Sequence, residues 1–99
     1  MQSRTPRPWL GLYTSADHDG VTIDGFSPVG PAARAGFRRG DRITSVNGVS
    51  VRSQEEFYEV LWKNRAGEVI QLSVQRDERT MVIPVQSVDR HRALTDGPR

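Results

Sequence analysis

The 99-residue chain contains no cysteine, which excludes a disulfide framework and a thiolate zinc site. It also has little net charge, because 14 basic residues stand against 12 acidic ones and leave only +2. No apolar run approaches the roughly 18 residues that a membrane-spanning helix requires. Arginines cluster at positions 38, 39 and 42, but acidic residues interleave with the basic ones along the chain. A mixed, solvated surface on one small domain is therefore favoured over a surface for nucleic acid or anionic membranes.

The sequence also lacks the patterns of catalytic, phosphate-binding and metal sites. No serine stands in a Gly-x-Ser-x-Gly elbow, no glycine-rich phosphate loop occurs, and neither His18 nor His91 is flanked like a triad base. The run at 17–20, Asp-His-Asp-Gly, lacks the later glutamate of a calcium loop and is interpreted as a solvated hairpin loop. The integrin-type tripeptide at 39–41, Arg-Gly-Asp, falls on a predicted turn. We expect no catalytic residue, no metal and no cofactor in this chain.

What the sequence does contain is apolar alternation of period two, which is typical of half-buried strands. The pattern predicts strands near 10–14, 20–24, 43–46, 69–76 and 81–85, a polar loop at 15–20, and a type I′ hairpin turn at 47–48. Residues 31–35 predict a short helix ended by Gly36, and Pro84 suggests an edge strand. A longer helix begins at Ser53, with Glu56 completing a capping box, and runs to about Asn64. These elements predict an α+β fold, a small antiparallel barrel or curled sheet of five to six strands capped by one short and one longer helix.

Several motifs, in the right order along the chain, resemble a known family. The segment 27–43, SPVGPAARAGFRRGDRI, resembles the "SP…GPAA.AG...GD.I" stretch of PDZ domains in their bacterial, circularly permuted form, and 45–48, SVNG, matches their usual hairpin. The segment 9–12, WLGL, resembles their carboxylate-binding loop, and the helix around Phe57 and the strand ending at 75–77 also agree. The likeness covers about residues 8–87. The segments 7–13, 57–62 and 87–90 are similar to the C-terminal PDZ domain of HtrA-type, trypsin-like serine proteases.

The resemblance implies a module that captures C-termini or exposed apolar segments of polypeptides by β-strand addition. Without a Cβ, Gly11 lets successive amides point at one spot, where they form a nest for a terminal carboxylate. The expected carboxylate loop comprises Trp9, Leu10, Gly11 and Leu12, with a charge-assisted contact from Arg7 or, less favourably, Arg4, and the expected strand-addition edge comprises Leu12, Tyr13 and Thr14. A plain strand start with a bulge is the alternative for this loop.

The longer helix has a wider apolar face than packing against one sheet requires. At about 100° per residue, Phe57, Val60 and Leu61 share one face, and Tyr58 and Trp62 widen the apolar arc to about 200°. We interpret Phe57 and Val60 as core, Tyr58 and Trp62 as groove walls, and Leu61 as shared between the two. An apolar terminal side chain is then the expected ligand preference. Alternatively, Tyr58 and Trp62 cover the domain's own edge or face a neighbouring protease domain.

The expected organisation is an N-terminal linker at 1–7, which has no signal-peptide apolar region, the PDZ domain at 8–87, and a tail at 88–99 that is predicted to be disordered. The resemblance implies a serine protease domain N-terminal to this one in the parent chain, to which the module delivers substrate or which it regulates. It also implies a bacterial periplasmic or envelope location. No nucleic-acid partner and no direct membrane insertion are expected. A scaffold or oligomerisation module without a protease is the alternative function.

Overall fold

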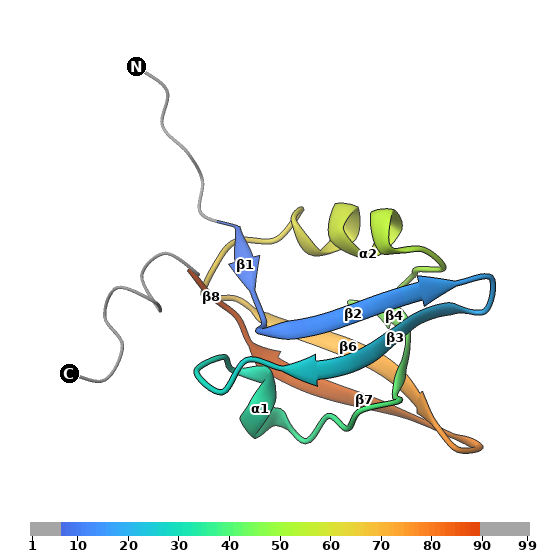
Figure 1. The fold of residues 1–99 in the computed structure, drawn as a ribbon. Coiled ribbons are helices and arrows are strands. Elements are labelled where there is room, and N and C mark those ends of the chain that lie inside the picture. The colour runs from blue at the N-terminus through green and yellow to red at the C-terminus, as the bar shows by residue number, and fades with distance from the viewer. Residues whose placement is uncertain (1–6, 90–99) are drawn as a thin grey trace.

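The computed structural model describes residues 7–89 and shows one curled sheet that lies between two helices (Figure 1). The six strands of this sheet are β2 (Leu12–Asp17), β3 (Gly20–Phe26), β4 (Arg42–Val46), β5 (Val49–Ser50), β6 (Val69–Arg76) and β7 (Arg79–Gln86). A separate two-stranded sheet pairs β1 (Pro8–Trp9) with β8 (Val88–Asp89), and the helices are α1 (Ala32–Ala35) and α2 (Gln54–Leu61). The predicted α+β fold, with one short and one longer helix, is confirmed.

The sheet is open and does not close into a barrel. Its strands follow the order β2-β3-β4-β6-β7, with β5 paired to β4 beside this path, and every pairing is antiparallel. Strands β2 and β7 are therefore the two edges of the described sheet. Pro84 lies on β7, where its missing amide N–H costs no hydrogen bond between strands, as its position in the sequence suggested. The other edge, β2, borders the groove described below.

Several element boundaries differ from the sequence prediction; the strand predicted near 10–14 begins at Leu12, and β3 extends to Phe26. Strand β2 extends to Asp17, which pairs with Gly20, so the predicted polar loop at 15–20 is a two-residue turn. The polar side chains of residues 15–17 are accepted in the strand because an edge strand exposes them. Helix α2 ends at Leu61, where the Asn64 side-chain amide donates to the carbonyls of Val60 and Leu61 and closes the last turn. Residues 88 and 89, predicted as the start of the tail, form β8. The rest of that tail, and residues 1–6, lie outside the described residues.

The beginning of α2 has the predicted cap with one change of partner. The Ser53 hydroxyl accepts the amide N–H of Glu56 at 3.1 Å, which is the expected half of a capping box. The Glu56 carboxylate, however, accepts the amide N–H of Arg52 at 3.0 Å in place of that of Ser53. The turn at 47–48 has the predicted type I′ character, because Asn47 and Gly48 both have positive φ values, 48° and 84°.

The core is formed by apolar side chains that alternate along the sheet and by a few from the loops and α2. Phe37 folds back into this core after Gly36, which takes the left-handed conformation with φ of 104°. Leu10, Phe57 and Leu61 belong to the core and also reach the groove described below. The buried hydrophobic residues are Leu10, Val21, Ile23, Ala32, Phe37, Ile43, Val46, Val51, Phe57, Leu61, Ile70, Leu72, Val74, Ile83 and Val85.

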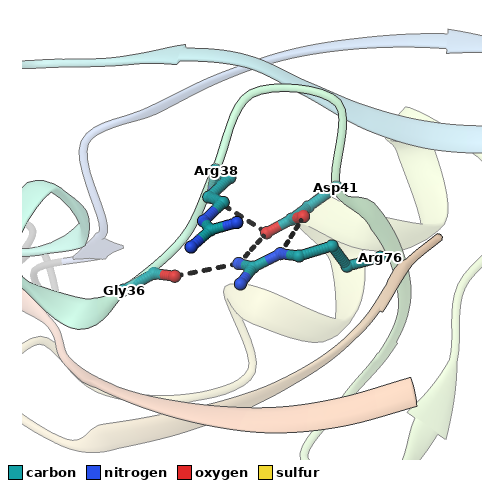
Figure 2. A network of polar contacts seen from close by, with 4 residues as sticks. All are labelled: Gly36, Arg38, Asp41 and Arg76. Carbon is teal, nitrogen blue, oxygen red and sulfur yellow. Dashed lines mark hydrogen bonds and ion pairs between the residues drawn. The ribbon is translucent and has the colours of Figure 1, made fainter. Parts of the chain in front are cut away.

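A buried ion pair fixes the loop between α1 and β4 (Figure 2). The Asp41 side chain is 1% exposed and accepts hydrogen bonds from Arg76 Nε at 2.8 Å, Arg76 Nη2 at 2.7 Å and the Arg38 amide at 2.9 Å. Arg76 Nη2 also donates to the Gly36 carbonyl at 2.9 Å. The hydrogen bond from Arg76 lowers the pKa of Asp41, and the Arg38 amide adds to this effect against the opposing influence of burial. The aspartate of the tripeptide at 39–41 is therefore a structural residue.

Candidate functional site

A groove of about 520 Å³ runs between the β2 edge and α2. Every site residue predicted from the sequence lines this groove except Thr14, which lies farther along β2. The structure thus brings together the predicted loop, edge and helix residues from segments that are separated by more than 40 positions in the chain. The lining residues are Arg7, Pro8, Trp9, Leu10, Gly11, Leu12, Tyr13, Ser27, Phe57, Tyr58, Leu61 and Trp62.

At one end of the groove, the loop before β2 is held by its carbonyl groups. The Leu10 carbonyl accepts the Ala32 amide N–H at 2.9 Å, and the Gly11 carbonyl accepts the Ser27 amide N–H at 2.8 Å. Within residues 7–89, no acceptor bonds the amide N–H of Leu10 or Gly11. The loop therefore has fixed carbonyls and two amide donors left for a ligand, an arrangement that suits an anion.

Gly11 is required in this loop for two separate reasons. Its φ of 76° lies in the left-handed region, which residues with a Cβ rarely adopt. A Cβ at this position would also stand 2.8 Å from the Cα of Gly30, closer than real Cβ contacts come. The sequence predicts only that the missing Cβ lets the backbone turn here; the second reason depends on the approach of the 27–31 loop, which brings Gly11 and Gly30 into contact.

Strand β2 turns backbone groups outward along the edge that β3 does not cover. The Ser27 amide donates to the Gly11 carbonyl, so the flanking pair Leu12 and Phe26 is a non-hydrogen-bonded pair of the ladder, and Leu12 directs its N–H and C=O away from β3. Thr14 pairs with Ile23, whose N–H donates to Asp41 and whose C=O accepts from Gly40. Ile23 thus turns both groups away from β2, so the Thr14 N–H and C=O also point away from β3, farther along the same edge. The open edge at Leu12 and Thr14 is the geometry that β-strand addition needs.

Helix α2 supplies an apolar floor and an aromatic wall. Phe57 and Leu61 are buried at the floor, while Tyr58 is half-buried and Trp62 is 42% exposed. The Tyr58 and Trp62 rings lie 4.9 Å apart between centroids, and Tyr58 also makes an edge contact with Phe57 at 5.1 Å. Val60 is half-buried against the core. These positions agree with the division of the helix into core and wall residues, and a ligand contact by Tyr58 and Trp62 stays a prediction.

Arg7 brings a positive charge to the same wall. Its guanidinium carbon lies 4.2 Å from the centroid of the Trp62 ring, a cation–π contact that holds a flexible side chain beside the carboxylate loop. Arg7 is predicted at the mouth of this loop, and it does line the groove there. Its stacking on Trp62 was not expected. The alternative, Arg4, lies outside the described residues.

Sequence reasoning missed three residues around the groove: Pro8, Ser27 and Gln54. Pro8 precedes the loop motif at 9–12, and Ser27 belongs to the motif at 27–43, to which no ligand contact was assigned. Gln54 begins α2, and its side chain reaches β2 across 40 positions of sequence. No local pattern signals such a contact, because a glutamine in the first turn of a helix is ordinarily solvated.

The acidic turn at 17–19 does bring possible metal ligands together. Donor atoms of Asp17, His18 and Asp19 lie within 4.8 Å of one another, and all three side chains are exposed. Asp17 already accepts the Asp19 amide N–H at 2.7 Å, which is an ordinary feature of a tight turn. This cluster carries no functional argument. None of the helices within residues 7–89 is long and apolar enough to cross a membrane.

The fold and the groove define a peptide-binding module of the PDZ type. A family model of the PDZ domain matches residues 8–87, and the chain belongs to this family. It is a binding module, and the family match extends over the loop, the β2 edge and α2.

Three relatives show the settings in which similar chains occur. The chain is 43% identical over 59% of its length to the magnetosome formation protease MamE of Paramagnetospirillum magneticum. It is 34% identical over 75% to a putative zinc metalloprotease of Brucella suis, and 33% identical over 87% to the putative serine protease HhoB of Synechocystis. The matched regions cover 8%, 19% and 22% of these relatives, so this chain spans less than a quarter of their length.

Solved structures show the same fold. The HtrA-type protease AlgW with a decapeptide superposes with a TM-score of 0.76 at 22% identity, covering 84% of this chain and 29% of that one. The HtrA3 PDZ domain bound to the phage-derived ligand FGRWV gives a TM-score of 0.70 at 19% identity, with 82% and 85% coverage. The predicted HtrA-type PDZ resemblance is confirmed.

Proposed function

We propose that this PDZ domain captures the C-terminus of a partner polypeptide by β-strand addition in the groove between β2 and α2. The observation that carries this proposal is the pair of free amides at Leu10 and Gly11, placed where the open edge of β2 begins. A terminal carboxylate would accept hydrogen bonds from these amides and from Leu12, and the preceding residues would extend along β2.

The groove also indicates which C-termini it prefers. Leu10, Phe57 and Leu61 form an apolar floor beside the carboxylate loop, so the last side chain of the ligand should be apolar. Arg7 would add attraction for the carboxylate from its position over Trp62. Because the peptide must be ordered on docking, we expect a dissociation constant on the order of micromolar.

A two-dimensional amide NMR titration tests this proposal directly. The 99-residue protein is titrated with hexapeptides that end in an apolar residue, each as the free carboxylate and as its amidated twin. Shifts concentrated at residues 10–14 and 58–62, weakened by amidation, would support both the groove and the carboxylate loop. Shifts at the same residues that ignore amidation would assign the groove to internal segments. Absence of shifts there would refute peptide capture and favour a docking surface for a neighbouring domain.

In the parent protein, we propose that the domain delivers polypeptides to, or regulates, an attached HtrA-like serine protease in the bacterial envelope, facing the periplasm. The support is the likeness to HtrA-type structures and to a relative named as a serine protease. A relative named as a metalloprotease shows that this domain does not by itself specify the catalytic chemistry. The test is whether a groove-binding peptide, added in trans, changes proteolysis by the whole parent protein; its amidated twin is the control.

A further inference from the structure

Gln54 links α2 to β2 just beyond the residues that line the groove. This first residue of α2 donates through Nε2 to the Thr14 carbonyl at 2.8 Å and lies 2.9 Å from the Thr14 hydroxyl. Both residues are half-buried. The Thr14 carbonyl points away from β3, so the Gln54 amide occupies a hydrogen-bonding position on the free edge of β2. The helix therefore supplies its own donor to the edge at which a ligand strand would pair.

The spacing of an antiparallel ladder indicates which ligand residue would bond to the Thr14 carbonyl. In the proposed binding mode, the last ligand residue lies opposite Leu12, and the ligand runs antiparallel to β2. Residues two apart on a strand face the same way, so the third residue from the ligand's C-terminus comes opposite Thr14. Its amide N–H would donate to the Thr14 carbonyl, where Gln54 Nε2 already donates.

We propose that Gln54 competes with the ligand for the β2 edge. The Gln54 side chain must leave the Thr14 carbonyl before the third residue from the ligand's C-terminus can pair with β2. The proposal rests on the proposed function and assigns Gln54 a part in it. The last two residues engage a preformed site, with the carboxylate loop at one end and the Leu12 backbone beside it. The third residue gains its hydrogen bond only by displacing one that the protein already makes. Gln54 therefore limits how much affinity the upstream part of a ligand contributes.

Substitution of Gln54 tests the competition. Gln54→Ala removes the donor, and Gln54→Met keeps the length of the side chain without any donor; Gln75→Ala is the matched control, because Gln75 is an exposed glutamine on β6 away from the groove. The probe is the hexapeptide of five alanines and a C-terminal leucine with a free carboxylate. Its twin has an ester in place of the amide N–H of the third residue from the end. Affinities are measured by calorimetric titration.

One net hydrogen bond should change affinity by about fivefold. We therefore expect both Gln54 variants to bind the hexapeptide about fivefold more tightly than the native protein and Gln75→Ala. The ester should weaken binding more in the Gln54 variants than in the native protein, because native Gln54 still satisfies the Thr14 carbonyl when the ligand cannot. The difference between the amide and ester ligands, measured within one protein, does not depend on any change in the stability of α2.

The contrary outcomes separate the two proposals. A carbonyl has two lone pairs, so Gln54 and the ligand could donate to Thr14 together. Unchanged affinity in both variants would show this and overturn the competition, while leaving peptide capture intact. Weaker binding in both variants, with an equal penalty for the ester in all proteins, would make Gln54 a ligand contact and also overturn it. If neither peptide binds the native protein or any variant, the proposed function itself fails.

Discussion

Replacement of Gly11 by alanine tests the physical basis of the carboxylate loop. An alanine at φ of 76° should cost about 1–2 kcal/mol, since L residues are disfavoured in the left-handed region. The new Cβ would also stand 2.8 Å from the Gly30 Cα, about 0.6 Å inside the 3.4 Å at which ordinary contact begins. Neither backbone can retreat without disturbing the hydrogen bonds that the Leu10 and Gly11 carbonyls accept from the 27–32 segment.

Loss of those two bonds should add about 1–3 kcal/mol, at about 0.5–1.5 kcal/mol for each. The expected total is a loss of about 3 kcal/mol in the free energy of unfolding, a large part of the roughly 5–15 kcal/mol of a small domain. Equilibrium urea denaturation should show this as a midpoint lowered by about 2 M, given a slope of about 1.5 kcal/mol per M. The binding of carboxylate-ended peptides should also fall, because the Leu10 and Gly11 amides lose their common direction.

Gly48→Ala is the matched control. Gly48 also has a left-handed φ, 84°, but a Cβ there would meet no atom within 4 Å. This variant should lose only the conformational cost of about 1–2 kcal/mol and should keep its peptide affinity. Equal destabilisation by the two substitutions would refute the argument from the Gly11–Gly30 contact. Undiminished peptide binding by Gly11→Ala would refute the role of this loop in carboxylate capture.

Three further predictions concern the groove wall, the buried ion pair and the helix cap. Trp62→Ala should weaken peptide binding about tenfold in a fluorescence anisotropy titration yet barely change the unfolding midpoint, because Trp62 is 42% exposed and lies outside the core cluster; unaltered binding would remove Trp62 from the groove wall. Asp41→Asn should cost about 2–3 kcal/mol at neutral pH, because it breaks a buried pair with Arg76. The folded-state pKa of Asp41 is lowered from 3.8, so the ionised carboxylate stabilises the fold fully above pH 3.8, and this stabilisation is lost as the pH falls through the folded-state pKa. Urea denaturation from about pH 7 to pH 2 should show this loss of stability in the native protein and not in the variant. Ser53→Ala should cost about 1 kcal/mol and lower the thermal midpoint by about 4–8 °C in calorimetry, and an unshifted midpoint would contradict the capping role of Ser53.

Much of the fold could be predicted because its signals are local. The turn at Asn47 and Gly48, the cap at Ser53 and the alternation in β6 each depend on residues a few positions apart, and each appears in the structure. The boundaries that shifted are those set by pairing partners. Asp17 extends β2 because Gly20 pairs with it, and residues 88–89 become a strand because β1 lies beside them. Neither segment has an apolar pattern of its own.

The groove, like the fold, has some features that the sequence alone predicts and others that arise only when the chain folds. The sequence by itself determined which residue types form the groove: a glycine that can take a positive φ between apolar neighbours, and a helix whose apolar arc is too wide for one packed face. Only the tertiary structure decided that the sheet stays open at β2, that Arg7 stacks on Trp62, and that Gln54 bonds to Thr14. Backbone propensity and periodicity act over a few residues and can be deduced from their order. A hydrogen bond between residues 40 positions apart exists only after the chain has folded and brought the two groups within reach.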